Sequence, residues 1–148
     1  FPVASAIKVA ILKIFGANIG TGVVVKSNVN IKYPWKLNVG DHTWIGEDVW
    51  IDNLDTVNIG DNCCLSQSCY LLTGNHDINS PTFDLKVSEI NLHNGSWIGA
   101  KAIVCPNVTI GKYTVLSVGS VATKSCDDFG IYQGNPAVYK KNRVINEN

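Results

Sequence analysis

The sequence has 148 residues, with 12 basic and 12 acidic side chains and a formal net charge of zero at pH 7. This balance provides no basic surface for nucleic acid, and the 45% apolar content predicts a single domain, 1–148, with a hydrophobic core. We find no run of 18 apolar residues and no secretory signal, so we expect no integral membrane segment and a cytoplasmic location. The chain contains no methionine and opens on Phe1, so we expect further residues to precede it in the natural protein.

The first predicted element is a short helix within residues 1–16. Apolar residues recur there at helical spacing, with two lysines on the other side: Ile7, Ala10, Ile11, Ile14 and Phe15, against Lys8 and Lys13. We predict that the apolar side covers the open end of the domain that follows, since solenoids need caps at their ends. A helix lying on a membrane surface is the alternative, for which two lysines are few.

Residues 17–127 repeat a unit of six residues. An aliphatic residue opens each unit, glycine often follows it, and a small or β-branched residue stands four positions after the aliphatic. The aliphatic positions are Ile19, Val25, Ile31, Val39, Ile45, Ile51, Ile59, Leu65, Leu71, Leu92, Ile98, Val104, Ile110, Leu116 and, more weakly, Ala122. Each unit predicts one short strand and one turn, with the aliphatic and small side chains inward and glycine supplying unusual turn dihedrals.

Three such units close one triangular coil, so the fifteen units predict an all-β fold, a parallel β-helix of about five coils. A β-sandwich would show period two and regular hairpin turns, whereas Asn94–Gly95 is the only Asn-Gly or Asp-Gly pair. Cys63 and Cys69 fall on inward small positions and are expected in the core. The five cysteines form no CxxC pair, so we expect reduced thiols. Residues 128–148 are expected to form a C-terminal tail.

The repeat is interrupted at one corner of the predicted coils. Three aliphatic residues recur at a spacing of twenty, which predicts that they stack: Ile31, Ile51 and Leu71. Two extra residues follow each of the first two, and the long segment 72–91 follows the third. We therefore predict an excursion loop at this corner, with Trp35, Asp55 and the pair Asn75–His76 clustered on one edge.

The excursion loop contains the histidine that is the candidate for chemistry. His42 and His93 lie on ordinary turns of the repeat and are expected to be exposed turn residues, whereas His76 belongs to the segment that breaks the repeat. Loops that leave a solenoid on one face commonly carry its binding function, although an insertion is also tolerated without one.

Several stretches carry a resemblance to a known family. The excursion TGNHD, the run WIGAKAIVCPNVTIGKYTVLSVGSVATK and the segment YQGNPA resemble the left-handed parallel β-helix acyltransferases. The stretch VNIKYPWKLNVGDHTWIGEDVWIDNL, together with TGNHD, is similar to the colanic-acid-type exopolysaccharide O-acetyltransferases. The similarity covers residues from about 16 to 141. It implies a left-handed coil, acetyl transfer from acetyl-CoA to a hydroxyl, a homotrimer, and an active site between two prisms.

A sugar hydroxyl is a poor nucleophile, so a base must take its proton as it attacks the thioester carbonyl, and His76 is the candidate general base. Its other ring nitrogen needs an acceptor to fix the tautomer, and a loop carbonyl, Asp77 or Asp55 could serve. A backbone N–H near Gly99 or Ala100 is the candidate donor to the oxyanion of the tetrahedral intermediate.

The resemblance implies a binding site for acetyl-CoA along the last coils. Trp97 is expected beside the pantetheine arm, with Thr123 and Lys124 near the nucleotide. Further candidates are Ser120, Lys140 and Lys141, the lysines as point charges for phosphates. The chain departs from the family pattern at Val138, where related enzymes often place a basic residue.

Aromatic and carboxylate side chains are the candidates for binding a sugar acceptor, because flat aromatics stack on sugar rings. The candidates are Trp35, Asp52, Asn53, Asp55, Asn75 and Asp77. Two more tryptophans, Trp44 and Trp50, occupy outward positions and could bind sugar or lie in a subunit interface.

Other functions remain open on the sequence. Acetyl transfer to an amino sugar or to serine is the nearest alternative. A zinc enzyme of the γ carbonic-anhydrase kind needs three convergent imidazoles, and of the three histidines in this chain His42 and His93 are expected on corners other than that of His76, so no metal is expected. A structural or ice-binding solenoid needs a flat, regular face, and the interrupted corner argues against it.

Overall fold

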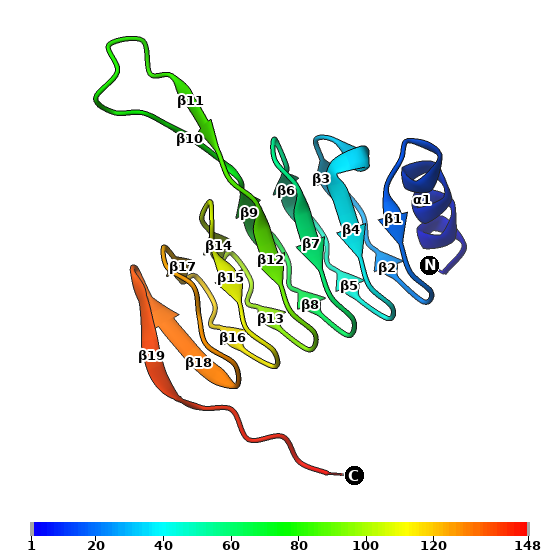
Figure 1. Ribbon diagram of the computed structural model, residues 1–148. Helices are drawn as coiled ribbons and strands as arrows, with labels where there is room; N and C mark the ends of the chain where they lie inside the picture. The colour runs from blue at the N-terminus through cyan, green and yellow to red at the C-terminus, as the bar shows by residue number, and fades with distance from the viewer. Residues whose placement is uncertain (1, 148) are drawn as a thin grey trace.

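The computed structural model describes residues 2–147 and shows a triangular parallel β-helix with a helix at its N-terminal end (Figure 1). The helix is α1 (Pro2–Ile14). Three sheets, whose strands are parallel up to the last one of the chain, form the walls of the coil. The first wall contains β1 (Asn18–Ile19), β4 (Leu37–Val39), β7 (Val57–Ile59), β12 (Ile90–Leu92) and β15 (Thr109–Ile110).

The other two walls follow the same order along the chain. The second wall contains β2 (Val24–Val25), β5 (Trp44–Ile45), β8 (Cys64–Leu65), β13 (Trp97–Ile98), β16 (Val115–Leu116), β18 (Gly130–Gly134) and β19 (Ala137–Asn142). The third wall contains β3 (Asn30–Ile31), β6 (Trp50–Asp52), β9 (Tyr70–Leu72), β14 (Ile103–Val104) and β17 (Val121–Ala122). A one-turn 3₁₀ helix, η1 (Pro34–Lys36), and a hairpin of β10 (Gly74–His76) and β11 (Leu85–Val87) leave the third corner.

The six-residue repeat sets the register of these walls. Ile31 pairs with Ile51, and Ile51 pairs with Leu71, so the predicted stacking at a spacing of twenty is confirmed. The aliphatic side chains fill the interior, and Cys63 and Cys69 lie among them with 2% and 0% of their surface exposed. Because each coil covers the apolar face of the next, one continuous core runs through the domain.

The coil count differs slightly from the prediction, at about six rather than five. Cys126 continues the first wall through a bridge to Ile110, and β18 continues the second wall by pairing with β16. Strand β19 then folds back antiparallel on β18. The six-residue pattern fades after residue 122, yet Cys126 and Tyr132 still supply buried side chains, so the coil persists beyond its clear sequence signature.

The glycines that follow aliphatic residues of the repeat allow neighbouring coils to pack closely. The prediction that they supply unusual turn dihedrals is wrong. A Cβ atom at Gly40 would lie 2.6 Å from the carbonyl carbon of Gly60, and a Cβ atom at Gly99 would lie 2.6 Å from the backbone nitrogen of Val118. The left-handed turn residue stands two positions after the glycine and is often not glycine, as at His42, where φ is 58°. The sequence signal was correct, but its cause is the tight approach of neighbouring backbones.

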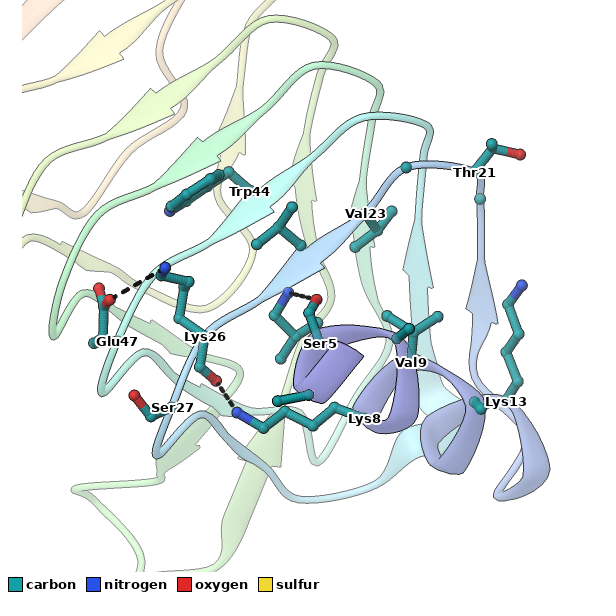
Figure 2. Close-up of a pocket in the computed structure, with 17 residues that line it drawn as sticks. Ser5, Lys8, Val9, Lys13, Thr21, Val23, Lys26, Ser27, Trp44 and Glu47 are labelled. Atoms are coloured by element: carbon teal, nitrogen blue, oxygen red, sulfur yellow. Dashed lines mark hydrogen bonds and ion pairs between the residues drawn. The ribbon is translucent and has the colours of Figure 1, made fainter. Parts of the chain in front are cut away.

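Helix α1 covers the end of the coil as predicted, but the side of the helix that faces the coil is opposite to the predicted one. Val9 and Leu12 pack against the core, and the buried Ser5 hydroxyl accepts a 2.9 Å hydrogen bond from the Val25 N–H (Figure 2). The side predicted to face the coil is solvent-exposed instead: Ile7 56%, Ile11 47%, Ile14 80% and Phe15 60%. Both sides of this helix are apolar, and a cap at the open end must also satisfy free backbone N–H groups, which favours the side with Ser5.

A cavity of about 960 Å³ lies between α1 and β2, with Trp44 and Glu47 at its margin (Figure 2). Its lining includes none of the residues predicted for catalysis. Within the described residues, no helix has both the length and the apolar character needed to span a bilayer.

Candidate active site

The hairpin of β10 and β11 projects from the corner after β9 (Figure 1). His76 pairs with Leu85, and Gly74 pairs with Val87. Directly opposed residues of a hairpin project to the same side, so His76 shares one side with the apolar Leu85 and Val87. The other side is polar, since Asn75 pairs with Lys86 there.

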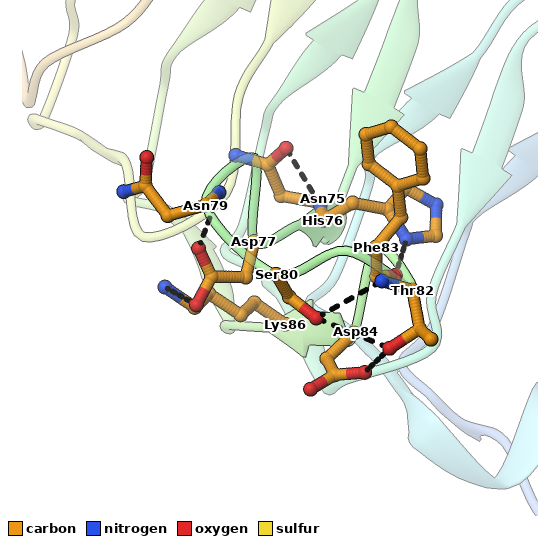
Figure 3. Close-up of polar contacts among 9 residues, drawn as sticks. All are labelled: Asn75, His76, Asp77, Asn79, Ser80, Thr82, Phe83, Asp84 and Lys86. Atoms are coloured by element: carbon orange, nitrogen blue, oxygen red, sulfur yellow. Dashed lines mark hydrogen bonds and ion pairs between the residues drawn. The ribbon is translucent and has the colours of Figure 1, made fainter.

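The His76 ring has a defined tautomer. Its Nδ1 atom lies 2.7 Å from the carbonyl oxygen of Phe83 (Figure 3). A carbonyl can only accept a hydrogen bond, so Nδ1 carries a proton, and in the neutral ring Nε2 keeps its lone pair. The exposed Nε2 can therefore accept a proton from a substrate hydroxyl.

The orienting group is thus the loop carbonyl, one of the three acceptors left open by the sequence. The Asp77 carboxylate is bonded elsewhere, 3.0 Å from the Asn79 N–H and 3.3 Å from the Lys86 ammonium. The Asp55 carboxylate accepts a 2.7 Å hydrogen bond from the Thr56 N–H.

The loops at this corner stack as predicted, and the Trp35 ring packs against a residue of its own loop. Asp55 reaches the base of the excursion, because its N–H donates to the Thr73 hydroxyl at 3.2 Å. The Trp35 ring packs on Tyr33, with 5.0 Å between ring centroids, and is 59% exposed. The hairpin of β10 and β11 extends outward past the corner (Figure 1).

The prediction that Asn53 binds the acceptor is at odds with its burial. Asn53 has 0% of its surface exposed, and its side chain bonds both the N–H and the carbonyl of Tyr33, at 2.9 and 2.7 Å. It also donates to the Lys36 carbonyl at 3.1 Å. Two extra residues at this corner interrupt the strand ladder, and the Asn53 amide satisfies the backbone groups left over.

Asp52 belongs to a polar and aromatic patch on the third wall, of which the sequence indicated Asp52 and Trp50 but not Tyr70. Its carboxylate lies 3.5 Å from the Lys32 ammonium and accepts a 3.4 Å hydrogen bond from the Tyr70 hydroxyl. Tyr70 packs on Trp50, with ring centroids 5.4 Å apart. Burial, and secondarily the Asp52 charge, raises the pKa of Tyr70. Tyr70 could have been found from its outward position, twenty residues after Trp50.

The residues predicted for acetyl-CoA are spread over two walls of one chain. Trp97 lies on the second wall, 46% exposed, with its indole N–H donating to the Ser66 hydroxyl at 2.8 Å. Thr123 and Lys124 follow β17 of the third wall, and two further exposed lysines lie on β19: Lys140 and Lys141. A half-exposed indole held by a hydrogen bond presents a fixed aromatic face.

Two of the remaining predicted cofactor residues have structural roles. The Gly99 N–H donates to the Leu116 carbonyl at 2.7 Å, so it is not free for an oxyanion. The Ser120 side chain is 1% exposed and accepts a 3.0 Å hydrogen bond from the Gly134 N–H, which attaches the C-terminal strands to the coil. Ala100 is half-buried beside Gly99 and stays the candidate donor.

His42 and His93 are exposed turn residues, as predicted. Across residues 2–147 the structure contains no group of three or more His, Cys, Asp or Glu side chains that could hold a metal ion.

Comparison with known proteins gives the family, although no family model matches the chain. A protein of Escherichia coli strain K12 named as a colanic acid biosynthesis acetyltransferase is 40% identical over 137 residues, which cover 93% of this chain and 75% of that protein. The galactoside O-acetyltransferase of the same strain is 26% identical over 141 residues, covering 93% of this chain and 67% of that one.

Solved structures agree with this assignment. A maltose O-acetyltransferase from Clostridium difficile 630 superimposes with a TM-score of 0.88 at 26% identity, covering 93% of this chain and 75% of that one. A hexapeptide-repeat acetyltransferase from Vibrio cholerae, complexed with acetyl coenzyme A, has the same fold, with a TM-score of 0.88 at 21% identity over 95% of this chain and 78% of that one.

The fold is therefore the left-handed parallel β-helix of the acetyltransferases, as the resemblance implied. The chain belongs to the hexapeptide-repeat acetyltransferase family.

Proposed function

We propose that the protein transfers acetyl from acetyl-CoA to a sugar hydroxyl in exopolysaccharide biosynthesis. The observation that carries the chemistry is the His76 imidazole, exposed on the hairpin with Nδ1 on the Phe83 carbonyl and Nε2 free. The 40% identical relative named for colanic acid biosynthesis supports the acceptor class. We place the reaction in the cytoplasm, and the five free cysteines fit a reducing compartment.

The reaction needs one base and one oxyanion donor. Nε2 of His76 takes the proton of the acceptor hydroxyl while the hydroxyl oxygen attacks the thioester carbonyl. The tetrahedral intermediate collapses by breaking its carbon–sulfur bond, and the imidazolium returns the proton to the leaving thiolate. The Nδ1–H bond to the Phe83 carbonyl stabilises the imidazolium and keeps the ring oriented through both steps.

The site is completed by a neighbouring copy in a homotrimer. The hairpin side that carries His76 also exposes large apolar side chains: Phe83 62%, Leu85 58% and Val87 44%. Exposed apolar patches of this kind mark contact surfaces, and a closed three-fold assembly would cover three equivalent hairpins. Light scattering should give a mass three times the 16.0 kDa of one chain, and a fully active monomer would contradict the proposal.

Acetyl-CoA binds along the last coils, with Trp97 beside the pantetheine arm and Thr123, Lys124, Lys140 and Lys141 toward the nucleotide. Isothermal titration with acetyl-CoA should show saturable binding, weakened roughly threefold to tenfold in Lys124→Ala, as expected for one charge facing a phosphate. Lys112→Ala is the matched control, because Lys112 is an exposed lysine on a regular corner of the coil. Absence of acetyl-CoA binding would contradict the enzyme assignment.

The acceptor class is tested by turnover. We expect acetyl transfer to hydroxyl groups of sugars, with Trp50, Asp52 and Tyr70 as the acceptor patch nearest the base of the hairpin. A panel of neutral sugars, amino sugars and serine measures this directly. Turnover restricted to amines would replace the proposed acceptor by an amino sugar, and turnover restricted to serine would replace it by that amino acid.

A further inference from the structure

We propose that the tip turn of the hairpin, residues 77–84, is a positioning device for His76, with Thr82, Asp77 and Lys86 as positioning residues. The inference rests on the proposed role of His76 as the base. It concerns how the Phe83 carbonyl is held at Nδ1, since that single contact decides which ring nitrogen is free.

Phe83 has a backbone conformation that needs support. Its φ is 50°, in the left-handed region. The Phe83 N–H donates to the Ser80 carbonyl at 3.1 Å, and this conformation directs the Phe83 carbonyl back across the hairpin to His76. Regular turns of the coil share this conformation, as at His42 with φ 58°, so the distinguishing feature of Phe83 is that its carbonyl must stay directed at His76.

Packing does not supply that support. None of residues 74–89 is buried, so the tip turn has no hydrophobic core of its own. A two-stranded hairpin without such a core is marginal in water. The side chains of the turn must therefore hold its shape by polar contacts.

The first stabilising contact joins the two residues that flank Phe83. The Thr82 hydroxyl donates to the Asp84 carboxylate at 2.7 Å, joining the residue before Phe83 to the residue after it (Figure 3). The Thr82 N–H also reaches the Ser80 hydroxyl at 3.3 Å. Rotation of the Phe83 peptide would break the bond between Thr82 and Asp84.

A second set of contacts fixes Asp77, the residue directly after His76. The Asp77 N–H donates to the Asp84 carbonyl at 2.8 Å, and the Asp77 carbonyl accepts from the Ser80 N–H at 3.1 Å. One oxygen of the Asp77 carboxylate accepts from the Asn79 N–H, and the other lies 3.3 Å from the Lys86 ammonium. Asp77 was predicted to bind the acceptor, and in the structure each of its carboxylate oxygens has a partner on the hairpin.

The position of the Phe83 carbonyl affects catalysis because it determines the tautomer of His76. With the carbonyl in place, the Nδ1 proton is fixed and Nε2 is a base. If the carbonyl moves away, the neutral ring divides between two tautomers, and the one with a proton on Nε2 cannot accept the hydroxyl proton. Loosening the turn should therefore lower kcat and leave the KM for acetyl-CoA unchanged.

The test replaces the Thr82 hydroxyl without changing the size of the side chain. Thr82→Val removes the donor, Thr82→Ser restores it, and Thr21→Val, at an exposed threonine on a regular turn, is the matched control. Nitrogen-15 NMR of the histidine rings reads the tautomer directly, and the chain has only three histidines to assign. We expect Thr82→Val to lose the single Nδ1–H tautomer and about tenfold in kcat, with recovery in Thr82→Ser.

A second pair of variants makes the result independent of one substitution. Lys86→Met removes the ion pair to Asp77, and Lys86→Arg restores it. We again expect Lys86→Met to lower kcat and to leave the KM for acetyl-CoA unchanged. An unchanged tautomer and turnover in both Thr82→Val and Lys86→Met, while His76→Ala is inactive, would overturn this inference and leave the proposed function standing. Full activity of His76→Ala would instead remove the proposed function.

Discussion

The wall of the coil and the excursion hairpin are stabilised in opposite ways. In the wall, stacked aliphatic side chains are fully buried, as at Leu65 and Leu71, and glycines allow neighbouring backbones to touch. In the hairpin no residue from 74 to 89 is buried, and polar contacts set its shape. The comparison shows a scaffold stabilised by a buried core and continuous backbone hydrogen bonds, carrying a loop in which a few polar contacts set the geometry of the site.

The largest expected difference in folding stability is between truncation of one aliphatic side chain in the wall and truncation of one in the hairpin. Leu65→Ala should lower the free energy of unfolding by about 2–5 kcal/mol, since Leu65 is fully buried and its loss leaves a cavity. Ile78→Ala, at a hairpin side chain 82% exposed and outside the apolar patch of Phe83, Leu85 and Val87, should change it by less than about 0.5 kcal/mol. Denaturant unfolding at one fixed protein concentration measures both. Equal losses in the two variants would show that the hairpin shares the stability of the wall.

A smaller difference separates two glycines within the wall. Gly99→Ala should cost about 1–3 kcal/mol, because the added Cβ meets the backbone of the next coil at 2.6 Å. Gly119→Asn should cost less than about 0.5 kcal/mol, because its surroundings are open and asparagines already adopt the same left-handed conformation, as at Asn107 with φ 64°. Melting temperatures provide the comparison, and a Gly119→Asn variant less stable than Gly99→Ala would refute the close-packing explanation.

The smallest predicted effect is a pH dependence that originates in the wall. Burial raises the pKa of the Cys69 thiol to about 12, with a further contribution from Cys64. Above about pH 9 the thiol ionises in the unfolded chain but not in the folded one, so folding stability falls as pH rises toward 12. Between pH 9 and pH 10 the loss from this group is about 1 kcal/mol. Unfolding of Cys69→Ala should show a shallower decline, and parallel curves for the two proteins would contradict the prediction.

The wall could be predicted from the sequence because its determinants repeat. An aliphatic residue at every sixth position encodes which side chains point inward, and the spacing from Ile31 to Leu71 encodes which coils stack. Periodicity predicted the wrong buried side for helix α1, because both sides of this helix have apolar residues at helical spacing. There the choice depended on Ser5 and on a free N–H at the open end of the coil.

The site could be predicted only as far as its side chains have a sequence signature. His76 could be predicted because it lies in the segment that interrupts the repeat. Its partner is the backbone carbonyl of Phe83, and every residue has a backbone carbonyl, so the residue type gives no signal. The burial of Asn53 was missed for a similar reason. Its amide bonds the backbone of Tyr33, twenty residues earlier, and that contact exists only after the coils have stacked.

The central claim is that the excursion exists to present the His76 imidazole as a general base. The direct measurement is kcat for His76→Ala with a verified sugar acceptor, beside His42→Ala and His93→Ala as matched histidine controls on regular turns. We predict a loss of about 10²- to 10⁴-fold in kcat for His76→Ala alone, with acetyl-CoA binding and the oligomeric state unchanged. Wild-type turnover in His76→Ala would contradict the claim.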